Sequence, residues 1–84
     1  MDKKTFGQWL KQERTSKSLT QDGLAKALGL NHSQEIAAFE SGSVAFPTKK
    51  IALLSKVLGV DKEKIFQMTL KIKETELRKK MEQA

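Results

Sequence analysis

The fold is decided by residues 20–42, which read TQDGLAKALGLNHSQEIAAFESG. The first half of this stretch predicts a short helix over residues 21–28, because Thr20 is a favourable N-cap and apolar side chains follow at helical spacing. Gly29 comes next, and glycine readily adopts the left-handed conformation in which many helices end. The side chains expected to face the core are Leu24, Ala25 and Leu28.

The second half of the stretch predicts another helix over about residues 33–41. Ser33 offers its N-cap, Gly42 stops it, and Ile36 and Phe39 are expected to be buried. Two short helices that cross at a steep angle leave the second one protruding. This is the geometry with which a helix enters the major groove of DNA.

Helices are predicted on both sides of this pair. One runs from about Lys4 to Ser16, a fourth follows an N-cap at Thr48, and a fifth begins at Lys62 after a cap at Asp61. The apolar side chains expected in the core of these helices are Phe6, Trp9, Leu10, Ile51, Leu54, Val57, Leu58 and Phe66. The sequence therefore predicts an all-α fold, with a compact five-helix domain over residues 1–68.

Residues 69–84 form a helical extension of different composition, rich in charge and sparse in apolar side chains. Leu70, Leu77 and Ala84 recur every seventh residue, and the pairs Glu74–Arg78 and Glu76–Lys80 are spaced to support a helix. Two readings stay open: a frayed terminal helix, or a helix that contributes to a dimer. Phe46 is expected either to lie on a dimer surface or to cap the core.

Composition narrows the class of protein. The chain has 84 residues, a net charge of +6 and no cysteine, so disulfides and cysteine-ligated zinc are excluded. It has neither an apolar run of the ~18–20 residues that a membrane span requires nor a secretory signal, and a cytoplasmic location is expected. The basic balance favours a polyanionic partner, although surface lysines also serve solubility.

Catalysis is not expected. His32 is the only histidine, and no serine or cysteine nucleophile is arranged around it. Glu35 and His32 alone cannot build a metal site, and no glycine-rich phosphate loop occurs. We expect no enzyme activity, no cofactor, no metal, no membrane partner and no small-molecule ligand.

The chain resembles the lambda-repressor-like (Cro/CI, XRE) family of helix-turn-helix DNA-binding proteins over about residues 6–66. The segments that carry the resemblance are Leu19-Thr20-Gln21, Leu24-Ala25, Leu28-Gly29, Ile36, Phe39-Glu40-Ser41-Gly42, Pro47 and Leu58-Gly59-Val60. The resemblance implies a five-helix domain, a homodimer and binding to a two-fold operator, as in a small repressor-like transcriptional regulator. A protein-interaction module on the same fold, like an antitoxin or adaptor, is the alternative.

When Ile36 and Glu40 are aligned with the family pattern, the base-facing positions fall on His32, Ser33, Gln34 and Ala38. Gln34 is the strongest candidate, since an amide can pair with the N6 and N7 atoms of adenine; a solvated glutamine is the plain alternative. Six residues separate Gly29 from Ile36, one more than usual. A one-residue shift turns the helix face by ~100°, which would make Glu35 or His32 the reader.

The resemblance also places Gln21, Lys49 and Lys50 beside DNA phosphates, and it pairs Arg14 with Glu40 as a structural ion pair. Ordinary surface roles for the two lysines remain open. Burying either charge of the Arg14–Glu40 pair alone would cost several kcal/mol, so pairing is expected. Gly23 is unexplained at this point, because glycine in a helix interior costs ~1 kcal/mol.

Overall fold

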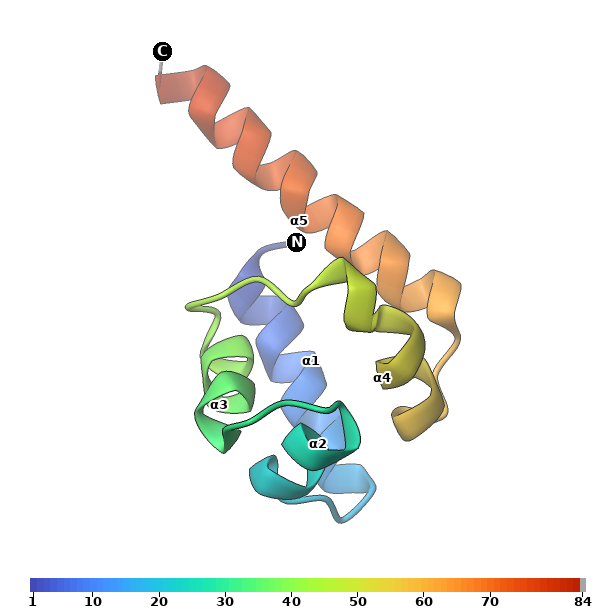
Figure 1. Cartoon of the computed structure of the whole chain (residues 1–84). Coiled ribbons are helices and arrows are strands. Elements are labelled where there is room, and N and C mark those ends of the chain that lie inside the picture. The colour runs from blue at the N-terminus through green and yellow to red at the C-terminus, as the bar shows by residue number, and fades with distance from the viewer. Residues whose placement is uncertain (84) are drawn as a thin grey trace.

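The chain is all-helical in a computed structural model, which describes residues 1–83 (Figure 1). The helical segments, in chain order, are α1 (Lys3–Ser16), α2 (Gln21–Ala27), α3 (Ser33–Ser41), the 3-10 turn η1 (Thr48–Lys50), α4 (Ile51–Leu58) and α5 (Lys62–Gln83). Among the described residues there is no strand. The predicted five-helix, all-α fold is therefore confirmed.

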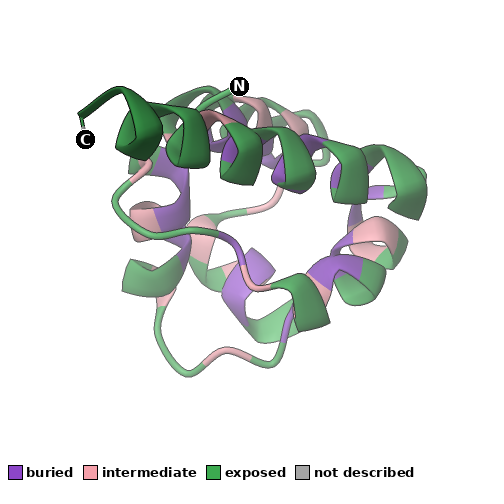
Figure 2. Ribbon diagram, turned by 90° about the horizontal axis from the view of Figure 1, so that it is seen from above, coloured by how far each residue is buried: buried purple, intermediate pink, exposed green. Residues whose placement is uncertain are grey.

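Buried side chains gather on the sides of the helices that face one another (Figure 2). The side chains of this core are Phe6, Leu10, Leu24, Ala25, Leu28, Ile36, Phe39, Phe46, Ile51, Leu54, Leu58, Ile65, Met68 and Ile72. Every helix contributes at least two of them, so no helix packs by a single contact. At ~1.5–3 kcal/mol for each large apolar side chain, this burial is the main term that offsets the conformational entropy lost on folding.

Local signals begin and end most helices where the sequence predicts. The Thr20 hydroxyl accepts a hydrogen bond from the Gly23 amide at 2.9 Å, as an N-cap should. Gly29, Gly42 and Gly59 all have positive φ. At these three positions the left-handed backbone conformation stops the preceding helix, because a residue with a Cβ would be strained there.

Two predicted N-caps are wrong. His32, not Ser33, precedes α3 in an extended conformation, and its backbone amide is held by the Glu35 carboxylate at 3.4 Å. Thr48 does not cap the fourth helix, since η1 comes first and α4 begins only at Ile51. At the start of α3 the cap comes from the local contact of Glu35 with the His32 amide, and at the fourth helix the 3-10 turn η1 takes up the residues next to Thr48.

The division of the aromatic side chains between the core and the surface differs from the prediction. Phe46 lies in the core, with its ring centroid 6.0 Å from that of Phe6 and 5.1 Å from that of Phe39. Its position rules out the dimer-surface reading. Phe66, predicted in the core, is 37% exposed. Trp9 is only partly buried and packs on Phe6 at 5.5 Å.

The fifth helix and the C-terminal extension are one element. α5 passes Met68 without a break, and Thr69 and Ile72 are buried beyond the predicted boundary. Glu74 pairs with Arg78 at 2.9 Å, as predicted. Glu76 instead lies 3.5 Å from Lys3, so the first helix takes the partner predicted for Lys80. The Leu70–Leu77–Ala84 heptad cannot be followed to its end, because Ala84 lies outside the described residues.

Candidate nucleic-acid interface

α2 and α3 are joined by a turn that begins at Gly29 and ends at His32. The Leu30 amide donates to the Ala25 carbonyl at 2.8 Å, which closes the last turn of α2. Gly29 has φ +70° and redirects the chain toward α3. The extra residue in this turn is therefore absorbed before α3 begins, in the extended segment that leads to His32.

The face of α3 opposite the core carries the candidate base-contacting side chains. Ile36, Phe39 and Glu40 are buried on the inner side. Gln34 is exposed and Ala38, one turn later, is half-buried, so both lie on the outer side. His32 is exposed at the start of the helix and Ser33 is half-buried in its first turn. Three of the four residues thus lie at the N-terminal end of α3, and Ala38 lies one turn beyond Gln34 on the outer side.

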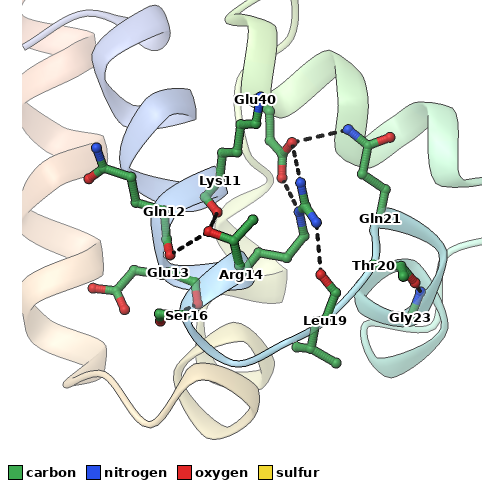
Figure 3. A network of polar contacts seen from close by, with 11 residues as sticks. Lys11, Gln12, Glu13, Arg14, Ser16, Leu19, Thr20, Gln21, Gly23 and Glu40 are labelled. Atoms are coloured by element: carbon green, nitrogen blue, oxygen red, sulfur yellow. Dashed lines mark hydrogen bonds and ion pairs between the residues drawn. The ribbon is translucent and has the colours of Figure 1, made fainter.

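A buried ion pair holds α3 against α1 (Figure 3). The Arg14 Nε donates to Glu40 Oε2 at 2.6 Å, and Nη2 donates to Oε1 at 3.3 Å. Arg14 Nη1 also donates to the Leu19 carbonyl at 2.8 Å, in the link between α1 and α2. Because both charged groups are almost fully buried, this two-point geometry compensates the loss of hydration that either charge would otherwise suffer.

Gln21 joins the same network from the first residue of α2. Its side-chain Nε2 donates to Glu40 Oε1 at 3.1 Å. The Glu40 carboxylate therefore receives hydrogen bonds from α1 and α2 while it sits on α3 (Figure 3). This contact gives Gln21 a structural task that the sequence did not predict, and its contact with a DNA phosphate stays a prediction.

The two lysines of η1 differ in their surroundings. Lys50 is half-buried, and its Nζ donates to the Leu28 carbonyl at 2.7 Å, closing the C-terminal end of α2. Lys49 is exposed, and no ion pair involves it among residues 1–83. Lys49 is therefore the lysine whose charge is available to a ligand, whereas Lys50 already satisfies a backbone carbonyl.

Gly7 is a position that sequence reasoning missed, and Gly42 has a packing role beyond the predicted one of ending α3. A Cβ on Gly7 would overlap the carbonyl oxygens of Phe39 and Glu40, and a Cβ on Gly42 would lie 2.8 Å from the Lys4 Cα. α1 and the end of α3 thus touch backbone to backbone. For Gly7 the only signal in the sequence was a glycine inside a helix, the same signal that Gly23 gives. At Gly23 a Cβ would lie 3.2 Å from the Thr20 hydroxyl that caps α2.

The family comparison agrees with this architecture. The helix-turn-helix family described as HTH_3 matches residues 10–65, which include α2, α3 and the turn between them. No curated protein matches the chain. In the part of the chain that the structure describes, no helix combines the length and the apolar character needed to cross a membrane. The match covers two thirds of the sequence, and this family is one of DNA-binding regulators. The chain belongs to the lambda-repressor-like (Cro/CI, XRE) helix-turn-helix family of DNA-binding regulators.

Proposed function

We propose that this protein is a small repressor-like transcriptional regulator that binds a specific double-stranded DNA sequence with α3 in the major groove. The observation that carries the proposal is the outer face of α3, where Gln34 is exposed and Ala38 lies one turn away. A small residue beside an exposed amide lets a helix approach base edges closely. Such a regulator would act in the cytoplasm, where it meets the chromosome.

The scaffold around α3 supports this role. A recognition helix must keep its orientation while its outer face is desolvated against DNA. Arg14 and Gln21 both hold Glu40, so α3 cannot rotate without breaking buried, charged hydrogen bonds. Base contacts from His32, Ser33, Gln34 and Ala38 would therefore be made by a rigid element.

Phosphate contacts would supply most of the affinity. The net charge of +6 favours a polyanion, and Lys49 is exposed close to the end of α2 that its neighbour Lys50 contacts. We assign Lys49 to a phosphate, with Lys50 and Gln21 as further candidates. One short helix reads few base pairs, so a homodimer on a two-fold operator would provide the specificity that a regulator needs.

The proposal is tested by selecting bound sequences from a random DNA pool and then measuring affinity at several salt concentrations. Binding should weaken steeply with salt, with a slope near ~0.9 for each neutralised phosphate. If the protein had no measurable affinity for any duplex at low salt, the proposal that it binds DNA would be overturned.

Two substitutions distinguish a side chain that contacts a base from one that contacts only a phosphate. Gln34→Ala should cost about 1–3 kcal/mol on the selected site and relax the choice at one base pair per half-site. Lys49→Ala should weaken selected and scrambled DNA equally and make the salt slope shallower by roughly one unit. Lys50 is unsuitable for this comparison because it also binds the Leu28 carbonyl. If Gln34→Ala lowered the affinity for selected and scrambled DNA equally, the base contact would instead be assigned to Glu35 or His32.

A protein-interaction module is the second candidate, favoured by one feature beside α3. An apolar hollow of about 320 Å³ is lined by Gln34, Glu35, Ala38, Phe39 and Val44. Val44 is 50% exposed at its rim, and Glu35 adds a negative charge that DNA would not favour. If the chain fails to bind duplex DNA at low salt, this hollow becomes the site to examine for a peptide or protein partner.

A further inference from the structure

α5 carries a stripe of exposed apolar side chains on the side away from the core. Phe66, Leu70, Leu77 and Met81 are 37%, 40%, 61% and 77% exposed, respectively. Phe66 and Leu77 are eleven residues apart, as are Leu70 and Met81. Eleven residues make just over three whole turns of an α-helix, so the four side chains follow one line along α5. They cannot be serving the core, which α5 meets through Ile65, Met68 and Ile72.

Charged side chains border this stripe with opposite signs on its two sides. At 100° per residue, the charged side chains nearest the stripe are Lys62, Lys73 and Lys80 along one border and Glu63 and Glu74 along the other. All five are exposed. Glu76 lies farther out on the lysine side and Arg78 on the glutamate side, where they pair with Lys3 and Glu74, respectively. The eleven-residue spacing recurs here, from Lys62 to Lys73 and from Glu63 to Glu74. The stripe and its borders are therefore one repeated pattern along the helix.

This asymmetry of charge selects both a partner and an orientation. When two identical helices pair in parallel about a two-fold axis along their length, the left border of one meets the right border of the other. Lysines would then face glutamates. In an antiparallel pair, like borders meet, so lysines face lysines and glutamates face glutamates, which is unfavourable. The stripe is thus complementary to a second copy of itself in the parallel orientation.

We propose that the α5 stripe, defined as Phe66, Leu70, Leu77 and Met81, binds the same stripe of a second copy in parallel. Lys73 of one copy would lie beside Glu74 of the other, which is also held by Arg78 of its own helix at 2.9 Å. The inference rests on the proposed function for the expectation of a homodimer and adds its interface and orientation. With only four apolar side chains per copy, the pair is a weak one that DNA binding would favour by mass action.

The parallel pair has a consequence for DNA binding because α5 is rigidly joined to the domain. Ile72 lies in the core, Lys3 pairs with Glu76 at 3.5 Å, and the Met1 ammonium donates to Thr75 at 3.3 Å. α2 and α3 lie on the far side of α1 from α5, toward the end where α5 begins and away from its last turns (Figure 1). A two-fold axis parallel to α5 would place both copies of α2 and α3 toward the same end of the dimer, as binding to one duplex requires.

Sedimentation equilibrium of the full chain without DNA tests the interface. The wild type should be a concentration-dependent dimer, and Leu77→Gln should raise its dissociation constant about a hundredfold, since two buried leucines are lost. Lys71→Gln, on another side of α5, should leave the dimer unchanged. Far-UV circular dichroism of each variant checks that α5 still folds. A wild type that stays monomeric at millimolar concentration, or a Leu77→Gln variant that dimerises like the wild type, would overturn the proposal.

Charge reversal and cross-linking test the orientation. Lys73→Glu should weaken the parallel dimer about tenfold, and Lys73→Glu with Glu74→Lys should restore it. In an antiparallel dimer, where lysines face lysines, Lys73→Glu in both copies would replace one like-charge contact by another and leave association largely unchanged. Because the chain has no cysteine, Met81→Cys introduces a single thiol. Its oxidation should link two copies in the parallel pair, whereas Lys71→Cys should not link them. A dimer that resists linkage through Met81→Cys is not parallel.

Failure of this inference and failure of the proposed function would look different. Dimerisation is measured here without DNA, so a parallel dimer that binds no duplex would refute the DNA-binding proposal and leave the interface standing. A chain that binds selected DNA but is monomeric both free and on DNA would refute the interface and the homodimer, and would leave DNA binding by α3 standing.

Discussion

Gly7 and the buried ion pair show how individual residues determine where α3 lies. Gly7 allows α1 to touch the backbone of α3 near Phe39 and Glu40, and the Arg14–Glu40 pair lies on the same side of α1. Steric contact sets the separation of the two helices, and the charged hydrogen bonds set their rotation. The orientation of the candidate recognition helix therefore depends on residues that touch no ligand.

Replacing Gly7 tests the steric part of this account. Gly7→Ala should lower the free energy of unfolding by about 1–3 kcal/mol, because the added methyl group overlaps backbone carbonyls that cannot rotate away. Gly23→Ala is the matched control, since its Cβ would only approach the Thr20 hydroxyl and the helix gains up to ~1 kcal/mol in propensity. Urea unfolding followed by circular dichroism measures both. Equal effects of the two substitutions would contradict the close approach at Gly7.

Removing one partner of the ion pair tests its electrostatic part. Glu40→Ala should destabilise the fold by about 3–5 kcal/mol, because Arg14 is left charged and buried. Arg14→Met combined with Glu40→Leu should recover much of this loss. The exposed Asp22–Lys26 pair is the control, and Asp22→Ala should change stability by less than about 0.5 kcal/mol. If Glu40→Ala matched that control, the buried pair would have no structural role.

Among the elements, α1 depends on a charged cap at its first turn. The Asp2 carboxylate accepts a hydrogen bond from the Thr5 amide at 2.7 Å. This backbone hydrogen bond, together with the Thr5 hydroxyl, lowers the pKa of Asp2 below its usual value. Since α1 carries Gly7 and Arg14, the cap begins the helix that orients α3.

The lowered pKa of Asp2 predicts a pH dependence with a definite sign. The carboxylate contributes stability above the unfolded pKa of about 3.9, and this contribution is lost as pH falls through the lower folded pKa. Asp2→Asn keeps an acceptor but not the charge. Its melting temperature should therefore lie below that of the wild type at neutral pH and approach it below about pH 4. An NMR titration that places the Asp2 pKa at or above 3.9 would refute the cap.

At the scale of the whole molecule, α5 has two tasks on two sides. Its inner side completes the core through Ile65, Met68 and Ile72, and its outer side carries the α5 stripe. The molecule measures 42 × 25 × 21 Å, and the long dimension follows from this one helix of 22 residues, about 33 Å in length. The C-terminal turns of α5 therefore reach beyond the domain.

Truncations separate the two tasks of α5. Ending the chain at Met68 should destabilise the domain by about 2–5 kcal/mol, because Ile72 leaves the core. Ending it at Glu76 keeps Ile72 and the contact with Lys3, so stability should change little while Leu77 and Met81 are lost from the α5 stripe. Thermal unfolding and sedimentation measure the two effects. A chain of residues 1–68 as stable as the whole protein would contradict this division.

The sequence by itself determined the elements and the family. The hydroxyl of Thr20 and the left-handed glycines Gly29, Gly42 and Gly59 act on backbone within a few residues, so their effect can be read without the rest of the chain. The resemblance implied the Arg14–Glu40 pair across 26 residues, and the structure shows its two hydrogen bonds. The position of Gln34 on the outer face follows from helical periodicity once Ile36 is inward.

Only the tertiary structure decided which apolar side chains are buried in the core and which polar side chains form long-range hydrogen bonds. Phe46 and Phe66 are chemically the same, yet only Phe46 meets Phe39 and the distant Phe6, 40 residues earlier in the sequence. Lys50 and Lys49 are neighbours, yet only Lys50 reaches the Leu28 carbonyl. Such choices depend on where a distant segment places its atoms. Local backbone preferences carry no information about that placement, because burial and long-range hydrogen bonds arise only when the helices pack.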